Sequence, residues 1–332
     1  MNERIQWLAV LRGLNIIFVV MGHVQLIDMS TGFNHDFCLR VTNPFGPFRM
    51  PLFIFCSGGL LYLSRIQKKW NTRDLYIDKF YRILCPFLFF VVFYYFFKLA
   101  LNPFTKTKVV FSIGDFLESF AVYNDHPSAH LWFLAVLLFF MLLYPLFKWL
   151  CRNDVSMWIF LLLSIIFYHI DSNLCGEKNY FYIDNLHLYL VFFFFGIFFF
   201  KYELYHYLST LWSFIIFVIL YVVSYLFTDL IFTSLLGILM MIAFSQQIAF
   251  YHSSLFSSFR EYIYQIYLMS FIFQPFVELI LWKKIFYNEN YFILFYLLNV
   301  LAGIYLPVFV SKLTERYGHK WLKICLGLKA ST

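Results

Sequence analysis

The feature that most constrains this chain is a series of apolar runs, each about 20 residues long, that follow one another along the sequence. A helix of that length crosses the hydrocarbon core of a bilayer. Hydrophobic residues make up 62% of the 332 positions and charged residues only 13%. Because a bilayer admits only helices and closed barrels, runs this long predict an all-α, polytopic membrane protein.

A window of about 19 residues finds about ten such runs. They lie near residues 5–27, 46–64, 83–101, 131–150, 155–171, 185–201, 209–227, 230–250, 262–282 and 291–312. The connections between them are too short for a separate soluble domain. We therefore expect a single transmembrane domain over residues 1–332.

The basic residues indicate an orientation. Placing the N-terminus in the cytoplasm puts the basic loop 65–82 and the basic tail 312–329 on the cytoplasmic side, as the positive-inside rule requires. An even number of spans then leaves both termini cytoplasmic in the inner (plasma) membrane. The net charge of +7 comes from basic residues in these short loops, where they are expected to meet anionic lipid headgroups. No nucleic-acid partner is expected.

Two polar residues interrupt the first apolar run. Arg12 and His23 are 11 residues apart, which on a helix places them within about 20° of each other and about 16 Å apart along the axis. An arginine inside a span is costly unless it faces the protein interior or a wet cavity. Both side chains therefore line one face of a channel wall, or, alternatively, Arg12 caps helix carbonyls and His23 is an interfacial hydrogen-bonding residue.

Five motifs in order carry a family resemblance. They are Arg12-x10-His23, FRMPLFIFCSGGLLYLSR, a basic loop running into KFYRILCPF, HLWFLAVLLFFMLLYPL and YIYQIYLMS. Together they resemble the acyltransferase-3 family of membrane O-acyltransferases. The resemblance implies transfer of an acyl group, commonly acetyl from cytoplasmic acetyl-CoA or another acyl-CoA, to a cell-surface glycan or a lipid-linked sugar. It also implies catalytic roles for His23 and Arg12.

The chemistry of O-acylation agrees with these residue types. A sugar hydroxyl must lose its proton as it attacks a thioester, and imidazole is a base suited to neutral pH. We expect His23 to be that base. Arg12, too far along the helix to contact the same atom, is expected to hold the pantetheine arm of the donor or an internal carboxylate.

Donor phosphates need cations, and the cytoplasmic loop 65–82 supplies them. Arg73, Lys79 and Arg82 are the expected donor-binding residues, with Lys79 and Arg82 on one helix face. Members of the family often have arginine where Lys79 stands, and lysine lacks the bidentate fork. The alternative is that these residues only obey the positive-inside rule.

The expected acceptor-binding residues are Arg49, Trp132, Tyr267 and Ser270. Arg49 stands where relatives often have histidine, and it either favours an anionic acceptor or anchors at the interface. Trp132 is either an aromatic-belt residue or a platform for a sugar ring. Ser270 replaces a histidine common in the family, so Tyr267 and Ser270 are expected to hydrogen-bond the acceptor or a neighbouring helix.

Other functions leave different signatures. The six cysteines are scattered and form no CxxC motif, and their spacing from histidines is not that of a metal site. We therefore expect no metal. A polysaccharide-precursor transporter or flippase is the main alternative, and it predicts paired, interrupted helices in two repeated halves, which the sequence lacks. The acceptor, the acyl length and the oligomeric state are left open.

Overall fold

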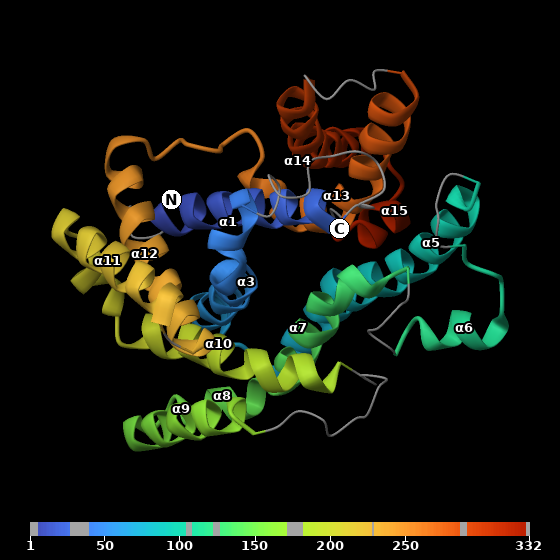
Figure 1. The fold of residues 1–332 in the computed structure, drawn as a ribbon. Coiled ribbons are helices and arrows are strands. Elements are labelled where there is room, and N and C mark those ends of the chain that lie inside the picture. Colours follow the sequence, from blue (N-terminus) through green and yellow to red (C-terminus); the bar gives the residue numbers. More distant parts are fainter. Residues whose placement is uncertain are drawn as a thin grey trace. The chain divides into compact units, whose positions relative to one another are not determined.

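The computed structural model describes residues 6–26, 40–103, 108–121, 127–170, 182–227, 229–285 and 291–329 (Figure 1). Every regular element in these ranges is a helix, which confirms the all-α class. The chain forms two compact units. Unit 1 comprises Met1–Cys56 and Tyr202–Arg316, and unit 2 comprises Ser57–Lys201 and Tyr317–Thr332. That the whole chain acts as a single transmembrane domain stays a prediction.

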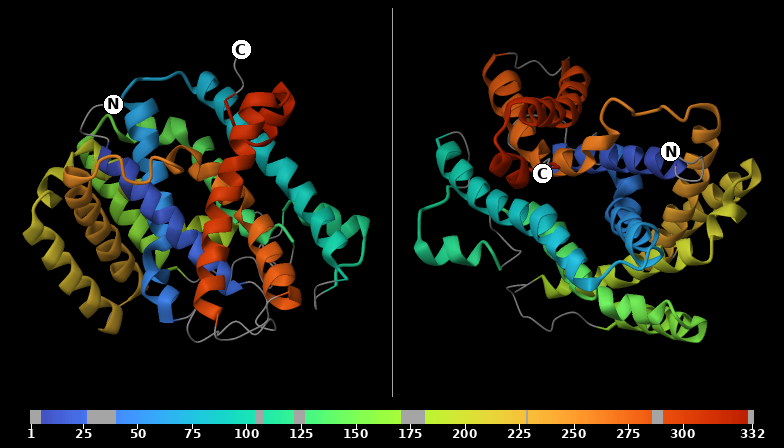
Figure 2. Two further views of the ribbon diagram at one scale, coloured as in Figure 1. Left: turned by 90° about the horizontal axis from the view of Figure 1, so that it is seen from above. Right: turned by 180° about the vertical axis from the view of Figure 1, so that it is seen from behind.

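Unit 1 contains both the first span and the last long helix. Its helices are α1 (Gln6–Leu26), η3 (Asn43–Phe45), the first part of α3 (Gly46–Leu61), η8 (Leu204–Leu208), α11 (Leu211–Phe227), α12 (Leu230–Tyr251), η9 (Arg260–Tyr262), α13 (Ile263–Phe276), the π-helix η10 (Val277–Ile285) and α14 (Phe292–Tyr317). The helix α1 packs against both α12 and α13, and α11 lies beside α12 (Figure 2).

Buried amides connect three helices of unit 1. Gln274 of α13 donates from Nε2 to the carbonyl oxygen of Val20 in α1 at 3.0 Å. Asn299 of α14 donates from Nδ2 to the carbonyl oxygen of Gln274 at 3.1 Å. Gly303 lets α14 approach Val20 and Gln274 closely, because a β-carbon there would contact both side chains. Such hydrogen bonds and small residues hold helices together where no water competes.

Unit 2 contains the basic loop and a phenylalanine-rich core. Its helices are the end of α3, the π-helix η4 (Tyr62–Ile66), α4 (Thr72–Lys79), the π-helix η5 (Phe80–Leu84), α5 (Cys85–Leu101), α6 (Ile113–Glu118), η6 (Ala129–Leu131), α7 (Trp132–Leu142), α8 (Tyr144–Leu150), α9 (Asp154–Tyr168), α10 (Ile183–Lys201) and α15 (Lys320–Cys325). Gly58 lies directly against the backbone of Phe193, which brings α3 and α10 together. Phe140 and Phe147 stack on Phe193 with ring centroids 4.7 and 5.5 Å apart.

Helices occupy all ten apolar runs, but fewer of them meet the length and apolarity of a membrane span. Six do so among the described residues: Gln6–Val24, Thr72–Leu101, Ile183–Lys201, Leu230–Tyr251, Arg260–Trp282 and Phe292–Tyr317. A seventh would be the run 131–150, which breaks at Leu143 into α7 and α8 with a bend of 55°. The apolar helices α9 and α11 have only 15 and 17 residues. The structure thus supports a multi-pass membrane protein and does not confirm about ten spans.

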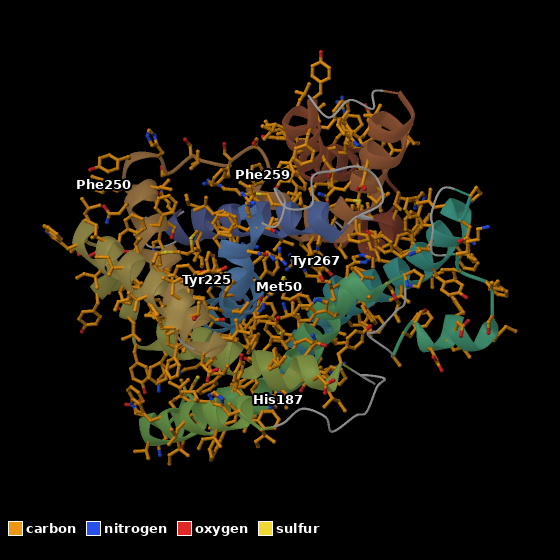
Figure 3. All side chains as sticks on the ribbon, viewed as in Figure 1. Met50, His187, Tyr225, Phe250, Phe259 and Tyr267 are labelled. Atoms are coloured by element: carbon orange, nitrogen blue, oxygen red, sulfur yellow. The ribbon has the colours of Figure 1, made fainter. Side chains whose placement is uncertain are left out.

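The outward faces of the helices carry large apolar side chains. On α11, Ile216, Leu220 and Phe227 are all more than 40% exposed. Phe250 of α12 is 82% exposed and extends away from its helix (Figure 3). A soluble protein rarely exposes so much contiguous apolar surface, whereas lipid chains cover it at no cost.

Candidate functional site

The first span presents His23 and Arg12 on one side of α1. His23 lies in the last turn of the helix and is 9% exposed, while Arg12 lies in its second turn and is partly exposed. The continuous helix between them confirms the periodicity on which the predicted shared face depends. The roles of the two residues stay predictions.

The imidazole of His23 is held by two residues of α13. Ser270 is completely buried, and its Oγ lies 3.5 Å from Nδ1 of His23, a long hydrogen bond whose direction depends on the tautomer. The ring of Phe271 stands edge-on to the imidazole at 5.3 Å. Within the described part of the chain, Nε2 of His23 makes no hydrogen bond. With the proton on Nδ1, the lone pair of Nε2 would be available to a substrate hydroxyl.

Arg49 of α3 lies next to His23. Its guanidinium occupies the space in which the β-carbon of any residue other than glycine at position 22 would stand. Gly22 immediately precedes His23, so a positive charge lies beside the imidazole within unit 1. The family resemblance predicts that Arg49 binds the acceptor. In the structure Arg49 lies at the same end of α1 as His23.

Tyr267 lies one turn before Ser270 on α13. It is 1% exposed, and its ring faces that of Phe53 of α3 at 6.0 Å (Tyr267 is labelled in Figure 3). Side chains three residues apart share a helix face. Arg49 of α3 and Ser270 of α13 thus both lie beside His23, and Tyr267 shares the helix face of Ser270. The acceptor-binding roles of these three residues stay predictions.

Arg12 has a different environment. Among the described residues no carboxylate forms an ion pair with it, and its electrostatic neighbour is the thiol of Cys56 in α3. The adjacent Gly13 packs against the side chain of Phe256. A cation left without a counter-charge in this setting would attract an anionic or strongly polar ligand.

The basic loop of unit 2 is organised around one carboxylate. Asp78 lies 3.1 Å from Arg65, 3.2 Å from Lys79 and 3.7 Å from Arg82. The side chain of Arg82 is 45% exposed, whereas those of Arg65 and Lys79 are 15% and 19% exposed. The cluster keeps a net charge of +2 when all four groups are ionised. The sequence pairing of Lys79 with Arg82 is thus confirmed as proximity, although the helix changes from α to π at Phe80 between them.

Arg65 was not among the predicted donor-binding residues, and the structure gives its guanidinium two partners: the carboxylate of Asp78 and the ring of Trp70. Its guanidinium stacks on the ring of Trp70 at 3.4 Å, and Lys148 and Tyr144 both donate to the carbonyl oxygen of Trp70 at 2.9 Å. These contacts hold Arg65 in the basic cluster. The spacing of Asp78 and Arg82 indicated their own ion pair, since an acidic and a basic residue four apart meet on a helix, but Arg65 lies 13 positions from Asp78 and no local pattern marks it.

Two expected residues of unit 2 lie outside that cluster. Arg73 is exposed in the first turn of α4. Trp132, at the start of α7, packs its ring against that of Tyr189 with centroids 4.7 Å apart. No group of three or more metal-binding side chains is found in the part of the chain that the structure describes.

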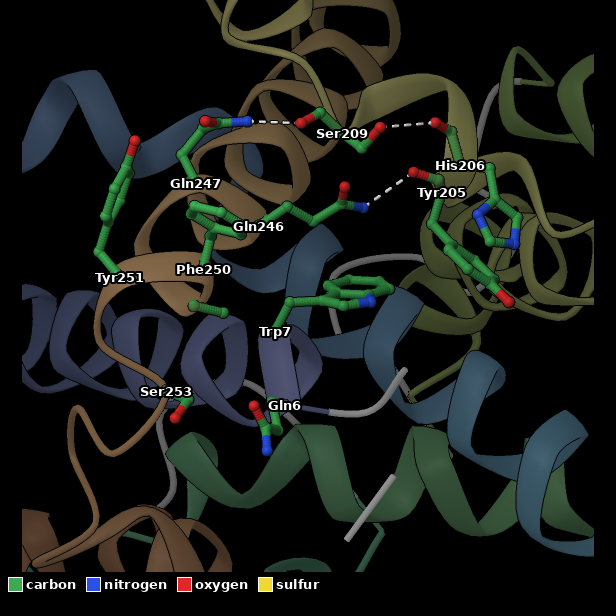
Figure 4. Close-up of a pocket in the computed structure, with 11 residues that line it drawn as sticks. Gln6, Trp7, Tyr205, His206, Ser209, Gln246, Gln247, Phe250, Tyr251 and Ser253 are labelled. Carbon is green, nitrogen blue, oxygen red and sulfur yellow. Dashed lines mark hydrogen bonds between the residues drawn. The ribbon is translucent and has the colours of Figure 1, made fainter. Parts of the chain in front are cut away.

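A cavity of about 800 Å³ in unit 1 was not anticipated (Figure 4). Its walls include Trp7 of α1, Tyr205 of η8 and the amides of Gln246 and Gln247, which donate to the carbonyl oxygens of Tyr205 and Ser209. Trp7 is five residues from Arg12, or about 140° around the helix. The cavity therefore lies on the side of α1 away from Arg12 and His23.

Fold and site together define a helical, multi-pass membrane protein with polar and basic side chains gathered on one face of its first span. The chain belongs to the acyltransferase-3 family: the family model, described as an acyltransferase domain, matches residues 5–312. It is accordingly a membrane acyltransferase. No curated protein and no solved structure matches the chain.

Proposed function

We propose that the protein is an O-acyltransferase of the inner membrane, with both termini cytoplasmic. It takes an acyl group, acetyl in the simplest case, from acetyl-CoA or another acyl-CoA and attaches it to a hydroxyl of a cell-surface glycan or glycolipid. The observation that carries the proposal is the position of His23: a buried imidazole with one nitrogen near Ser270, the other without a partner among the described residues, and Arg49 beside it.

The reaction needs one base that later acts as an acid. Nε2 of His23 takes the proton of the acceptor hydroxyl as its oxygen bonds to the thioester carbonyl carbon. When the tetrahedral intermediate collapses, the carbon–sulfur bond breaks and the imidazolium returns the proton to the leaving thiolate. The products are the ester and free CoA, and neither a metal nor a redox partner is required.

The positive charge beside His23 is assigned to the carbonyl oxygen of the donor rather than to the base. The carbonyl oxygen becomes negative in the intermediate, and a fixed cation in a site of low dielectric stabilises such an oxyanion. Arg49 is the cation nearest to His23 among the residues described in unit 1. The same guanidinium would bind an acceptor that carries a carboxylate or phosphate, with Tyr267, Ser270 and Trp132 as further acceptor-binding residues.

The donor is assigned to the cationic groups. Arg12 holds the pantetheine arm. Lys79 and Arg82 of the Asp78 cluster, together with the exposed Arg73 earlier in the same loop, bind the phosphates of CoA. Because Asp78 already neutralises part of this surface, phosphate binding depends most on Arg82, the most exposed member of the Asp78 cluster.

The proposal is tested by acyl transfer in proteoliposomes. Purified full-length protein is supplied with labelled acetyl-CoA and with separate pools of glycan and lipid-linked saccharide, and label in each pool is counted. We expect label in an acceptor pool, together with release of one CoA thiol per ester formed.

The alternative function, transport of a polysaccharide precursor, predicts a different result in the same vesicles. A transporter would move a labelled lipid-linked saccharide across the vesicle membrane without any release of CoA thiol. That outcome, with several acceptor pools unlabelled, would overturn the proposed function.

A further inference from the structure

Asn15 is a buried amide that the site described above does not use. It lies in α1, one turn after Arg12, and is 1% exposed. Neither Oδ1 nor Nδ2 of Asn15 has a hydrogen-bond partner in the described part of the chain. Burying an amide without hydrogen-bond partners is unfavourable, and native proteins rarely keep such a group without a use for it.

The position of Asn15 on α1 relates it to both motif residues. Asn15 is about 60° around the helix from Arg12 and about 4.5 Å from it along the axis. It is about 80° and 12 Å from His23. Asn15 therefore lies on the same side of α1 as the two motif residues and between them in depth.

We propose that Asn15 binds an amide of the donor's pantetheine arm. The inference rests on the proposed function and names a residue that holds the donor between Arg12 and His23. A pantetheine arm contains two secondary amides, and a carboxamide is complementary to each: Nδ2 donates to the ligand carbonyl while Oδ1 accepts from the ligand N–H. The ligand supplies the two partners that the protein does not.

Asn15 does not act on the reacting atoms. A separation of about 12 Å along α1 keeps its amide out of reach of a carbonyl attacked beside His23, so it is no oxyanion donor. Asn15 is a positioning residue that fixes how deep the donor enters. An acceptor sugar is a poorer match, because the acceptor meets the donor at the His23 end of the face.

The test measures binding of CoA itself to the full-length protein in lipid nanodiscs, against adenosine 3′,5′-bisphosphate, which lacks the arm. We expect Asn15→Leu to weaken CoA binding about tenfold, as loss of two neutral hydrogen bonds predicts. Binding of adenosine 3′,5′-bisphosphate should be unchanged. Asn15→Ala serves as the second variant and should give the same pattern.

Thermal stability distinguishes this role from a structural one. Asn15→Leu should keep or raise Tm, because it removes a polar group without protein partners. The matched control is Asn299→Leu, which removes the hydrogen bond to Gln274 and should lower Tm without changing CoA affinity.

Three results would overturn the inference. They are unchanged CoA affinity in Asn15→Leu, an equal loss of affinity for adenosine 3′,5′-bisphosphate, or a Tm loss like that of Asn299→Leu. Failure of the proposed function is recognised separately, because wild-type protein would then bind no CoA and transfer no label.

Discussion

The contact between His23 and Ser270 determines which groups can exchange a proton with the imidazole. A second imidazole at the position of Ser270 could itself exchange protons with His23. A serine hydroxyl cannot do so near neutral pH, but it can hold one ring nitrogen and leave the other exposed to substrate. In this chain His23 is therefore the group expected to carry the whole proton transfer.

Removing the hydroxyl of Ser270 tests whether it orients the base. Ser270→Ala should lower kcat about tenfold, because one neutral hydrogen bond to the imidazole is lost, with little change in donor KM. The matched control is Ser245→Ala, another completely buried serine of unit 1, which bonds only the carbonyl oxygen of Ile242. Equal kcat in the two variants would show that Ser270 does not orient His23.

Gly22 gives a way to displace Arg49 without mutating it. In Gly22→Ala the new β-carbon occupies the space of the Arg49 guanidinium, so the charge must move away from His23. Transfer should fall about tenfold or more, as in Arg49→Ala, and the double variant should be no worse than Arg49→Ala, since both changes remove one interaction.

The control for this substitution is Gly46→Ala, whose β-carbon meets nothing within 4 Å. It should leave transfer unchanged. Additive losses in the double variant would mean that Gly22 acts independently of Arg49.

At the scale of elements, the Asp78 cluster lies where the helix changes type. The α-helix Thr72–Lys79 passes into the π-helix Phe80–Leu84, and both Lys79 and Arg82 still reach Asp78. Single π-helical turns are rare and occur frequently at functional sites. In this cluster three cations share one carboxylate, which leaves a net positive charge when all four groups are ionised.

Asp78→Asn should destabilise unit 2. Without the carboxylate, the partly buried cations Arg65 and Lys79 repel each other and the exposed Arg82, and leaving such charges without their partner costs a few kcal/mol. Thermal unfolding should show a lower Tm, while Asp74→Asn, an exposed carboxylate on the same helix, should have a much smaller effect. Equal Tm values for the two variants would contradict the role of Asp78.

At the scale of the molecule, the sequence predicted what depends on local pattern. Apolar runs of about span length indicated the helices. The eleven-residue spacing indicated that Arg12 and His23 share one helix face. Both predictions follow from helical geometry. The break at Leu143 was not predicted, because the apolar run continues through it. The only helix-breaking residue close to it is Pro145, in the first turn of α8. The contacts of Gly22 with Arg49 and of His23 with Ser270 were not predictable either, because they depend on how distant helices pack.

The arrangement of the whole chain in the membrane has a direct test. We predict an even number of spans, which would place both termini on one side, and the positive-inside rule predicts that this side is cytoplasmic. Epitope tags at the two ends should both be cleaved by protease in inside-out vesicles and both be protected in right-side-out vesicles. Tags on opposite sides would require an odd number of spans.

The measurement that tests the account most directly compares acyl transfer by His23→Ala with that by His319→Ala in matched proteoliposomes. His319 is exposed and serves as the control histidine. Loss of a general base lowers the rate about 10²- to 10⁴-fold, so His23→Ala should transfer almost no label from acetyl-CoA while binding CoA normally. His319→Ala should match the wild type. Full transfer by folded His23→Ala would contradict the central claim that this imidazole is the base.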